Sequence, residues 1–149
     1  MARFRTTVQS PHPPEVVFDA LSDFSTVAQW DPNVESAERM DDGEIGVGTK
    51  FKVLNDFFGR KQKLVYETLK HDRPNEFIVE AKTSAFDSND TVTFVATDSG
   101  CDVTYDAVIT MHGAGRFVDP LIGLLFRIVG SKAEKGLREY VNRPDLVAG

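Results

Sequence analysis

The middle of the chain alternates apolar and polar residues with a period of two through five consecutive segments, and this pattern restricts the fold more than any other feature. A period of two places successive side chains on opposite faces of a β-strand. Short sequences rich in Gly, Asp, Asn and Pro separate the segments. We therefore predict an antiparallel meander with one apolar face and one solvated face. The segments are "TKFKVLND", "KQKLVYET", "EFIVEAK", "DTVTFVAT" and "CDVTYDAVITMH".

The amino-terminal part of the chain predicts one strand and two short helices. Residues 3–9, "RFRTTVQ", have the β-branched and aromatic content typical of a strand. Apolar residues then recur at helical spacing over residues 16–28, behind prolines that suit a first helical turn. Ser, Thr and Asp residues at 22–26 interrupt this pattern with side chains that favour helix caps, which indicates two successive helices. Pro32 disfavours helix at Asp31 and ends the second one.

The carboxy-terminal part predicts one long helix that begins at the Asp119-Pro120 pair and continues to Pro144. Its first half is apolar on nearly every side, so we expect it to be buried on more than one side. Such a helix can cover the apolar face of the meander, which gives an α+β fold with a curved sheet gripping a helix. Two apolar stripes follow the helix: Val118, Ile122, Leu125, Val129, Ala133, Leu137 and Tyr140 form the first, and Phe117, Leu121, Leu124 and Ile128 form the second.

The length and composition of the chain fit one domain over residues 1–149. A net charge of −6 argues against a nucleic-acid partner, because phosphate binding needs clustered Lys and Arg. No apolar run approaches the roughly 20 residues of a membrane span, and the amino terminus has no apolar core of a secretory signal. The single cysteine, Cys101, has no internal disulfide partner. We expect a cytoplasmic protein.

The sequence contains no recognisable metal or cofactor motif. His12, His71 and His112 are scattered, and together with one cysteine they do not give the spacing of a metal site. The stretch "GAGR" at 113–116 lacks the glycine spacing of a dinucleotide loop and instead suits a turn from sheet to helix. We therefore expect neither a metal nor a cofactor.

The chain resembles the START-related superfamily (SRPBCC), which includes birch-pollen-allergen-like proteins, lipid-transfer domains and polyketide cyclases/dehydratases. The resemblance covers nearly the whole chain. It is strongest in a helix followed by a tryptophan and a proline before the next strand, at Pro14, Val17, Phe18, Leu21, Asp23, Trp30 and Pro32. It implies a helix-grip fold, in which two short helices form a V and a cavity lies between the concave face of the sheet and the long helix. It implies no single chemistry, because carriers, sensors, chaperone co-factors and enzymes share this fold.

Residues on the inward face of this fold are the candidate ligand-binding residues. Burying a polar group without a partner costs about 1–3 kcal/mol, so the polar members need internal partners or a wet cavity. Trp30 either fills the core or lines the cavity. Asn55 and Asp90 lie near predicted strand ends, where they either reach solvent or face inward. The full set is Trp30, Phe51, Val53, Asn55, Tyr66, Phe77, Val79, Asp90, Phe94, Tyr105, Met111, Phe117, Leu121 and Leu124.

The leading hypothesis is non-covalent binding of a small hydrophobic molecule, such as a lipid, a polyketide or an isoprenoid, between the sheet and the long helix. One alternative is a polyketide cyclase/dehydratase-like enzyme in which Tyr66, Asp90 or Tyr105 transfers protons. Another is an interaction module or homodimer that buries the apolar helix face at 117–128 against a partner. The residues alone decide neither the identity of the ligand nor whether a reaction is catalysed.

Overall fold

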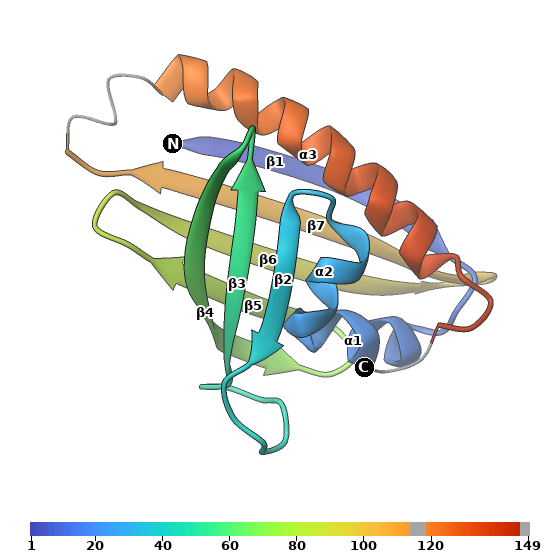
Figure 1. Cartoon of the computed structure of the whole chain (residues 1–149). Helices are drawn as coiled ribbons and strands as arrows, with labels where there is room; N and C mark the ends of the chain where they lie inside the picture. Colours follow the sequence, from blue (N-terminus) through green and yellow to red (C-terminus); the bar gives the residue numbers. More distant parts are fainter. Residues whose placement is uncertain (114–118, 147–149) are drawn as a thin grey trace.

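The computed structural model describes residues 1–113 and 119–146. One sheet of seven strands wraps around a long carboxy-terminal helix, and two short helices close the sheet at one end (Figure 1). This arrangement confirms the predicted α+β fold. The strands are β1 (Ala2–Ser10), β2 (Val34–Arg39), β3 (Lys50–Phe57), β4 (Arg60–Asp72), β5 (Glu76–Lys82), β6 (Phe86–Thr97) and β7 (Gly100–Met111).

The sheet is antiparallel throughout and has the order β1-β7-β6-β5-β4-β3-β2. Strands β3 to β7 form the predicted meander of five segments, β2 extends it at one edge by pairing with β3, and β1 pairs with β7 along its whole length. The register shifts between Val34 and Ser36 and between Thr68 and Lys70. Irregularities of this kind bend a strand and increase its twist, which helps a sheet to curve around a helix.

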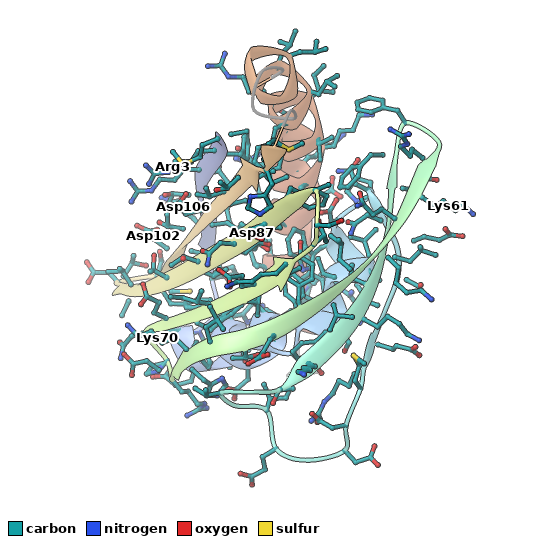
Figure 2. The ribbon with its side chains drawn as sticks, turned by 90° about the vertical axis from the view of Figure 1, so that its left-hand side faces the viewer. Arg3, Lys61, Lys70, Asp87, Asp102 and Asp106 are labelled. Carbon is teal, nitrogen blue, oxygen red and sulfur yellow. The ribbon has the colours of Figure 1, made fainter. Side chains whose placement is uncertain are left out.

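The two faces of the sheet follow the alternation of the sequence. Phe51, Val53 and Val103 point inward and are almost completely buried. The outer face carries charged side chains, and Figure 2 shows Arg3 and Asp106 among them on the outside of the sheet. The guanidinium of Arg3 lies 2.7 Å from the carboxylate of Asp106 on the neighbouring strand. The predicted apolar and solvated faces are therefore confirmed.

Two short helices, α1 (Pro14–Ser22) and α2 (Val27–Trp30), are joined by the 3-10 turn η1 (Phe24–Thr26). Asp23 separates them, because its Oδ1 accepts hydrogen bonds from the amide of Ser25 at 3.2 Å and from its hydroxyl at 2.5 Å. The chain leaves α2 at Asp31, whose carbonyl accepts a hydrogen bond from the amide of Val34 at 3.0 Å. The predicted pair of helices is confirmed, and the proline-containing turn leads directly into β2.

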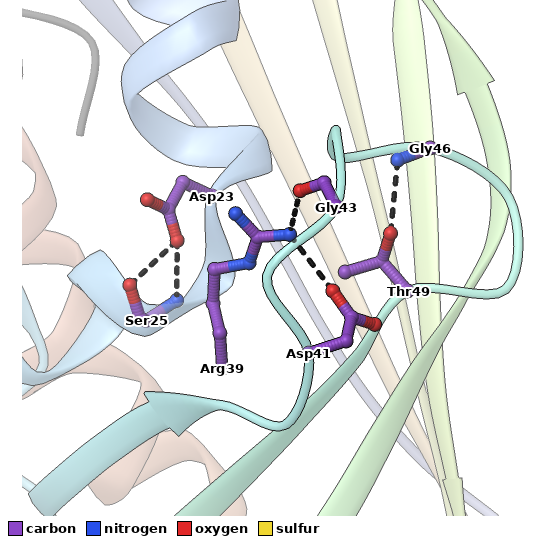
Figure 3. A network of polar contacts seen from close by, with 7 residues as sticks. All are labelled: Asp23, Ser25, Arg39, Asp41, Gly43, Gly46 and Thr49. Atoms are coloured by element: carbon purple, nitrogen blue, oxygen red, sulfur yellow. Dashed lines mark hydrogen bonds and ion pairs between the residues drawn. The ribbon is translucent and has the colours of Figure 1, made fainter.

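A polar network holds the loop between β2 and β3 (Figure 3). The guanidinium of Arg39 donates to the carboxylate of Asp41 at 2.8 Å and also to the carbonyl of Gly43. The hydroxyl of Thr49 accepts a hydrogen bond from the amide of Gly46 at 3.0 Å. Two of these bonds satisfy backbone groups, the carbonyl of Gly43 and the amide of Gly46, in a loop that has no regular secondary structure.

The long helix α3 (Asp119–Val141) begins at the predicted residue and ends before Pro144. It packs along β1 and against α2. Two glycines allow this close packing: a Cβ atom at Gly130 would meet the ring of Phe4, and one at Gly136 would overlap the carbonyl oxygen of Trp30. No helix in the described part of the chain is long and apolar enough to cross a membrane.

The expectation that the first half of α3 is buried on more than one side is wrong. Leu121 and Leu124 are 58% and 56% exposed, and Ile128 is also exposed. The sheet and α2 cover only one side of α3, and nothing among the described residues covers the opposite side. The described members of the second apolar stripe, Leu121, Leu124 and Ile128, therefore face outward.

Candidate functional site

A cavity of about 100 Å³ lies between the inner face of the sheet and α3. Its wall is formed by strands β1, β3, β4, β6 and β7, by the end of α2 with the turn that follows, and by the middle of α3. Most of the wall is apolar, and a few polar side chains interrupt it. The lining residues are Phe4, Thr6, Trp30, Asp31, Asn55, Phe57, Leu64, Tyr66, Phe86, Ser88, Asp90, Tyr105, Ala107, Ile109, Phe126, Val129, Gly130, Ala133, Glu134 and Leu137.

A carboxyl–phenol pair forms the polar centre of the cavity. The hydroxyl of Tyr105 donates a hydrogen bond to Oδ2 of Asp90 at 2.5 Å. Asp90 is opposite Ala107 in the β6–β7 register, so Tyr105 is its diagonal neighbour on the same face. Both side chains are buried. The pair is positioned by regular strand pairing, which gives it a rigid support.

A second phenol lies nearby on β4. The hydroxyl of Tyr66 is 3.0 Å from the hydroxyl of Ser88, and both side chains are buried. Tyr66 also packs its ring against that of Phe24, with 4.9 Å between the ring centroids. The two tyrosines therefore present hydroxyl groups to the cavity while aromatic contacts hold their rings.

Burial determines the protonation of these groups. Removal from water disfavours a charged carboxylate and raises the pKa of Asp90 to about 7. The hydrogen bond from Tyr105 favours the carboxylate and opposes this rise in part. The negative charge of Asp31 adds to the rise. Burial also raises the pKa of Tyr66 and of Tyr105, so both phenols remain protonated donors near neutral pH. Asp90 can therefore accept or release a proton near neutral pH.

The end of α2 contributes Trp30, and the turn that follows it contributes Asp31. The Trp30 ring meets the Tyr105 ring edge-on, with 5.5 Å between centroids. Oδ1 of Asp31 accepts hydrogen bonds from the amide and the side chain of Asn33, at 2.8 and 2.9 Å. The Asn33 side chain also donates to the carbonyl of Val129 on α3 at 3.2 Å. This turn joins the short helices to α3 and places both an aromatic ring and a carboxylate at the cavity.

Burial also raises the pKa of Asp31, and the hydrogen bonds from Asn33 oppose that rise only in part. At the other side of the cavity, the hydroxyl of Thr6 donates to Oε2 of Glu134 at 2.5 Å, and Arg138 donates to Oε1 at 3.0 Å. The bond from Thr6, with the added effect of Arg138, lowers the pKa of Glu134. Glu134 is therefore ionised near neutral pH.

Asn55 provides an unsatisfied donor. Its side chain is 6% exposed and lines the cavity, and its Nδ2 has no hydrogen-bond partner among the described residues. A buried amide left in this way costs about 1–3 kcal/mol unless water or a ligand pairs with it. Asn55 therefore marks a position where a bound molecule can gain a hydrogen bond.

Five of the residues expected at the site line this cavity: Trp30, Asn55, Tyr66, Asp90 and Tyr105. Trp30 fills space in the core and lines the cavity at once, so its two predicted roles coincide. Asn55 and Asp90 face inward and are buried, which excludes the solvent-exposed alternative. Strand β6 begins at Phe86, so Asp90 lies within a strand instead of at a turn.

The remaining expected residues lie elsewhere. Five are buried in the core without lining the cavity, namely Phe51, Val53, Phe77, Val79 and Phe94. The reason is that α1 and η1 fill that part of the sheet: the Phe18 ring lies 5.8 Å from Phe77 and 5.3 Å from Phe94, and Phe24 lies 6.2 Å from Phe51.

The last four expected residues lie toward the carboxy terminus. Met111 is partly buried at the end of β7 and does not line the cavity. Leu121 and Leu124 are exposed on the outer side of α3, which corrects their expected inward position. Phe117 lies outside the described residues.

Several lining residues were not expected. Val129, Ala133 and Leu137 belong to the first apolar stripe of the long helix, and their spacing of four residues already placed them on one face. Phe4 and Thr6 share the inward phase of β1. No local signal in the sequence identified Asp31 or Glu134, because each reaches the cavity through tertiary packing.

Comparisons with known proteins agree with this fold. Residues 1–142 match the family model described as polyketide cyclase / dehydrase and lipid transport. A solved structure from Thermus thermophilus is 22% identical, with 94% of this chain and 95% of that chain covered and a TM-score of 0.74. A START superfamily protein from Mycobacterium smegmatis is 14% identical, with 95% of this chain and 97% of that chain covered and a TM-score of 0.71.

The Zhui aromatase/cyclase from Streptomyces sp. R1128 is 16% identical, with 93% of this chain and 90% of that chain covered and a TM-score of 0.68. No curated protein matches the sequence. At these identities the solved structures establish the fold alone, and they confirm the predicted helix-grip architecture of the START-related superfamily.

Proposed function

This chain belongs to the polyketide cyclase / dehydrase and lipid transport family, and we propose that it binds a small hydrophobic molecule in the cavity between the sheet and α3. The observation that carries this proposal is the wall of that cavity, which is mostly apolar and has a few fixed polar groups. Small-molecule sites in proteins have this composition. The polar groups orient the ligand, and the apolar wall supplies most of the binding free energy, at roughly 25 cal/mol for each Å² removed from water.

The size of the cavity limits the ligand. An engineered protein cavity of about 150 Å³ binds benzene, so a volume of about 100 Å³ suits roughly one ring. A polyketide, an isoprenoid or a lipid chain would extend beyond this space unless α3 moves away from β1. We therefore expect single-ring compounds to bind without a structural change and longer ligands to bind with displacement of α3.

Binding can be tested by native mass spectrometry and thermal shift with a panel of single-ring aromatic compounds, aromatic polyketides and long-chain lipids. The expected result is at least one binder whose complex shows chemical-shift changes at cavity residues on β6 and β7. A panel without a binder would overturn the proposal. Binding that perturbs only residues outside the cavity would also overturn it.

The Asp90–Tyr105 pair favours a second function, that of a cyclase- or dehydratase-like enzyme. A carboxylate with a pKa of about 7 can remove a proton from a carbon next to a ketone and can return it to a departing hydroxyl. Tyr105 would hold Asp90 in place, and Asn55 or Tyr66 would donate a hydrogen bond to the ketone oxygen. Turnover of a polyketide-like substrate that survives in Asp90→Asn, Tyr66→Phe and Tyr105→Phe variants would remove this assignment.

The exposed side of α3 supports a third function, an interaction module or homodimer. Leu121, Leu124 and Ile128 form an exposed apolar strip on one side of the helix. Light scattering distinguishes this function from the first two, because it requires a stable dimer that Leu124→Asp dissociates. A monomer at high concentration would exclude the homodimer. The cytoplasmic setting stays a prediction.

A further inference from the structure

The charges around the cavity have one sign. Asp31, Asp90 and Glu134 line it, and the described lining residues include no Lys, Arg or His. Arg138 pairs with Glu134 at 3.0 Å and compensates its charge. Asp31 and Asp90 have no basic partner among the described ion pairs. The negative charge of Asp31 makes the ionisation of Asp90 less favourable. The wall of the cavity is therefore unfavourable for an anion and favourable for a cation.

Aromatic rings lie beside these carboxyl groups. Trp30, Tyr66 and Tyr105 all line the cavity, and the centroids of the Trp30 and Tyr105 rings are 5.5 Å apart. The faces of aromatic rings attract cations, most strongly when water is excluded. Rings and carboxyl groups together form a surface that suits an organic ammonium group.

The unpaired amide of Asn55 is an independent sign that the cavity is built for a ligand. Asn55 lies on β3, away from the β6–β7 pair, and its Nδ2 lacks a partner among the described residues. A ligand oxygen that accepts this hydrogen bond would remove the cost of the buried donor. Asn55 thus extends the polar recognition beyond the carboxyl groups.

We propose that the cavity selects a small aromatic molecule that carries a protonated amine, and that it rejects carboxylates and phosphates. The amine lies between Asp90 and Asp31 against the rings of Trp30 and Tyr105. A carboxylate in the same position would face both acids in a medium of low dielectric constant, where like charges repel strongly. This inference rests on the proposed binding function and specifies the chemistry of its ligand.

Three compounds of one size test the inference: benzylamine, benzyl alcohol and benzoate. Calorimetry at about pH 8, where Asp90 is ionised, should give an affinity for benzylamine roughly tenfold or more above that for benzyl alcohol, as expected for a hydrogen bond to a charged group. Benzoate should not bind measurably. Equal affinities for the amine and the alcohol would overturn the inference and leave the proposed binding function standing. If no compound in this series or in the larger panel binds, the binding function itself fails.

The pH dependence and two variants make the test specific. Protonation weakens an acceptor for an ammonium group, so the affinity for benzylamine should fall from about pH 8 to about pH 5, whereas that for benzyl alcohol should change little. Besides Tyr105 and Tyr66, the groups whose charges act on or face Asp90 are Asp31, Asp106 on the outer face, and Glu134 from α3. Any of these acids that becomes protonated between about pH 8 and about pH 5 also lowers the affinity for benzylamine.

Asp90→Asn should remove most of the preference for the amine and keep the affinity for the alcohol. Asp102→Asn is the matched control, because Asp102 lies on β7 and points outward from the sheet (Figure 2). It should retain the preference of the unmodified protein. An unchanged preference in Asp90→Asn, with the fold verified by circular dichroism, would overturn the inference.

Discussion

The hydroxyl of Tyr105 donates a 2.5 Å hydrogen bond to Oδ2 of Asp90 inside the cavity beneath α3. The bond favours the ionised carboxylate, but burial acts in the opposite direction and has the larger effect. The carboxyl group of Asp90 consequently has a pKa of about 7 instead of 3.8. We expect folding stability, ligand preference and proton transfer all to depend on this one group.

Replacing Asp90 with Asn should change how stability depends on pH. The folded-state pKa of Asp90 is above its ordinary value. The contribution of Asp90 to the free energy of unfolding is therefore most favourable below about pH 4 and is lost as the pH rises to about 7. Asn cannot ionise. Between these two pH values, the free energy of unfolding of Asp90→Asn should therefore rise relative to the unmodified protein by up to the order of 4 kcal/mol. Urea denaturation across this range measures the difference.

Asp102→Asn serves as the control for that comparison, because Asp102 lies on the outer face of β7 (Figure 2). Its stability difference from the unmodified protein should stay nearly constant over the same pH range. A difference for Asp90→Asn that is equally flat would show that Asp90 titrates at its ordinary pKa.

Replacing Tyr105 with Phe should raise the pKa of Asp90 above about 7, because the hydrogen bond that favours the carboxylate is removed. The carboxyl carbon resonance of Asp90, followed by NMR as a function of pH, reports this pKa directly. Tyr66→Phe removes a hydroxyl of the same kind that is bonded to Ser88 instead. It should affect Asp90 less, and an equal effect of both changes would contradict a specific role of the Tyr105 bond.

Filling the cavity should abolish ligand binding without unfolding the protein. Ala133 lines the cavity from α3, and Ala133→Leu would place its added carbons in the open space. We expect loss of binding in the mass-spectrometric assay with a stability change of at most about 1–3 kcal/mol. Ser131→Leu adds a leucine to an exposed position of the same helix and should bind normally. Full binding by Ala133→Leu would locate the ligand outside this cavity.

The contact between α3 and Trp30 predicts opposite effects for two glycines of one helix. In Gly136→Ala the new methyl group would overlap the carbonyl oxygen of Trp30, so α3 must shift, with a loss of about 1–3 kcal/mol. A methyl group at Gly123 would meet no heavy atom within 4 Å apart from its chain neighbours and the nearby backbone of its own helix. Gly123→Ala should stabilise the protein by up to about 1 kcal/mol through helix propensity. Thermal unfolding of both variants measures the contrast, and equal midpoints would contradict the tight packing at Gly136.

Trp30 offers an optical measure of cavity occupation. It is the only tryptophan in the chain, and it is 7% exposed beside Tyr105. A ligand in the cavity should change its emission in a saturable manner, with the same midpoint that calorimetry gives. Calorimetric binding without any change in emission would indicate a site remote from Trp30.

Much of the fold was predictable because the signals are local. The alternation in "FKVLN" and "VTY" assigned Phe51, Val53 and Tyr105 to the inner face, and strand pairing preserves that assignment. Asp90 was harder to place, because "FDSND" is rich in residues typical of turns. The pairing of β6 with both β5 and β7 overrides this preference and holds Asp90 in a strand.

The position of the cavity along the inner face was not predictable. Phe77 and Phe94 have the same phase as Asp90, yet Phe18 of α1 packs against both and leaves no space there. Asn55 and Tyr66 line the cavity instead, although the Tyr66 ring also packs against Phe24 of η1. Period-two patterns distinguish inside from outside, but they contain no information about which inward residues another element will cover.

The sequence by itself determined the strands, the two short helices, the long helix and the inward face of the meander strands, because these follow from the local periodicity of apolar residues. Tertiary structure decided which side of α3 faces the sheet. Leu124 and Val129 lie on different stripes that are both apolar, so hydrophobicity cannot choose between them. The close contacts at Gly130 and Gly136 fix the rotation of the helix, since only a side without Cβ atoms can approach Phe4 and Trp30 so closely.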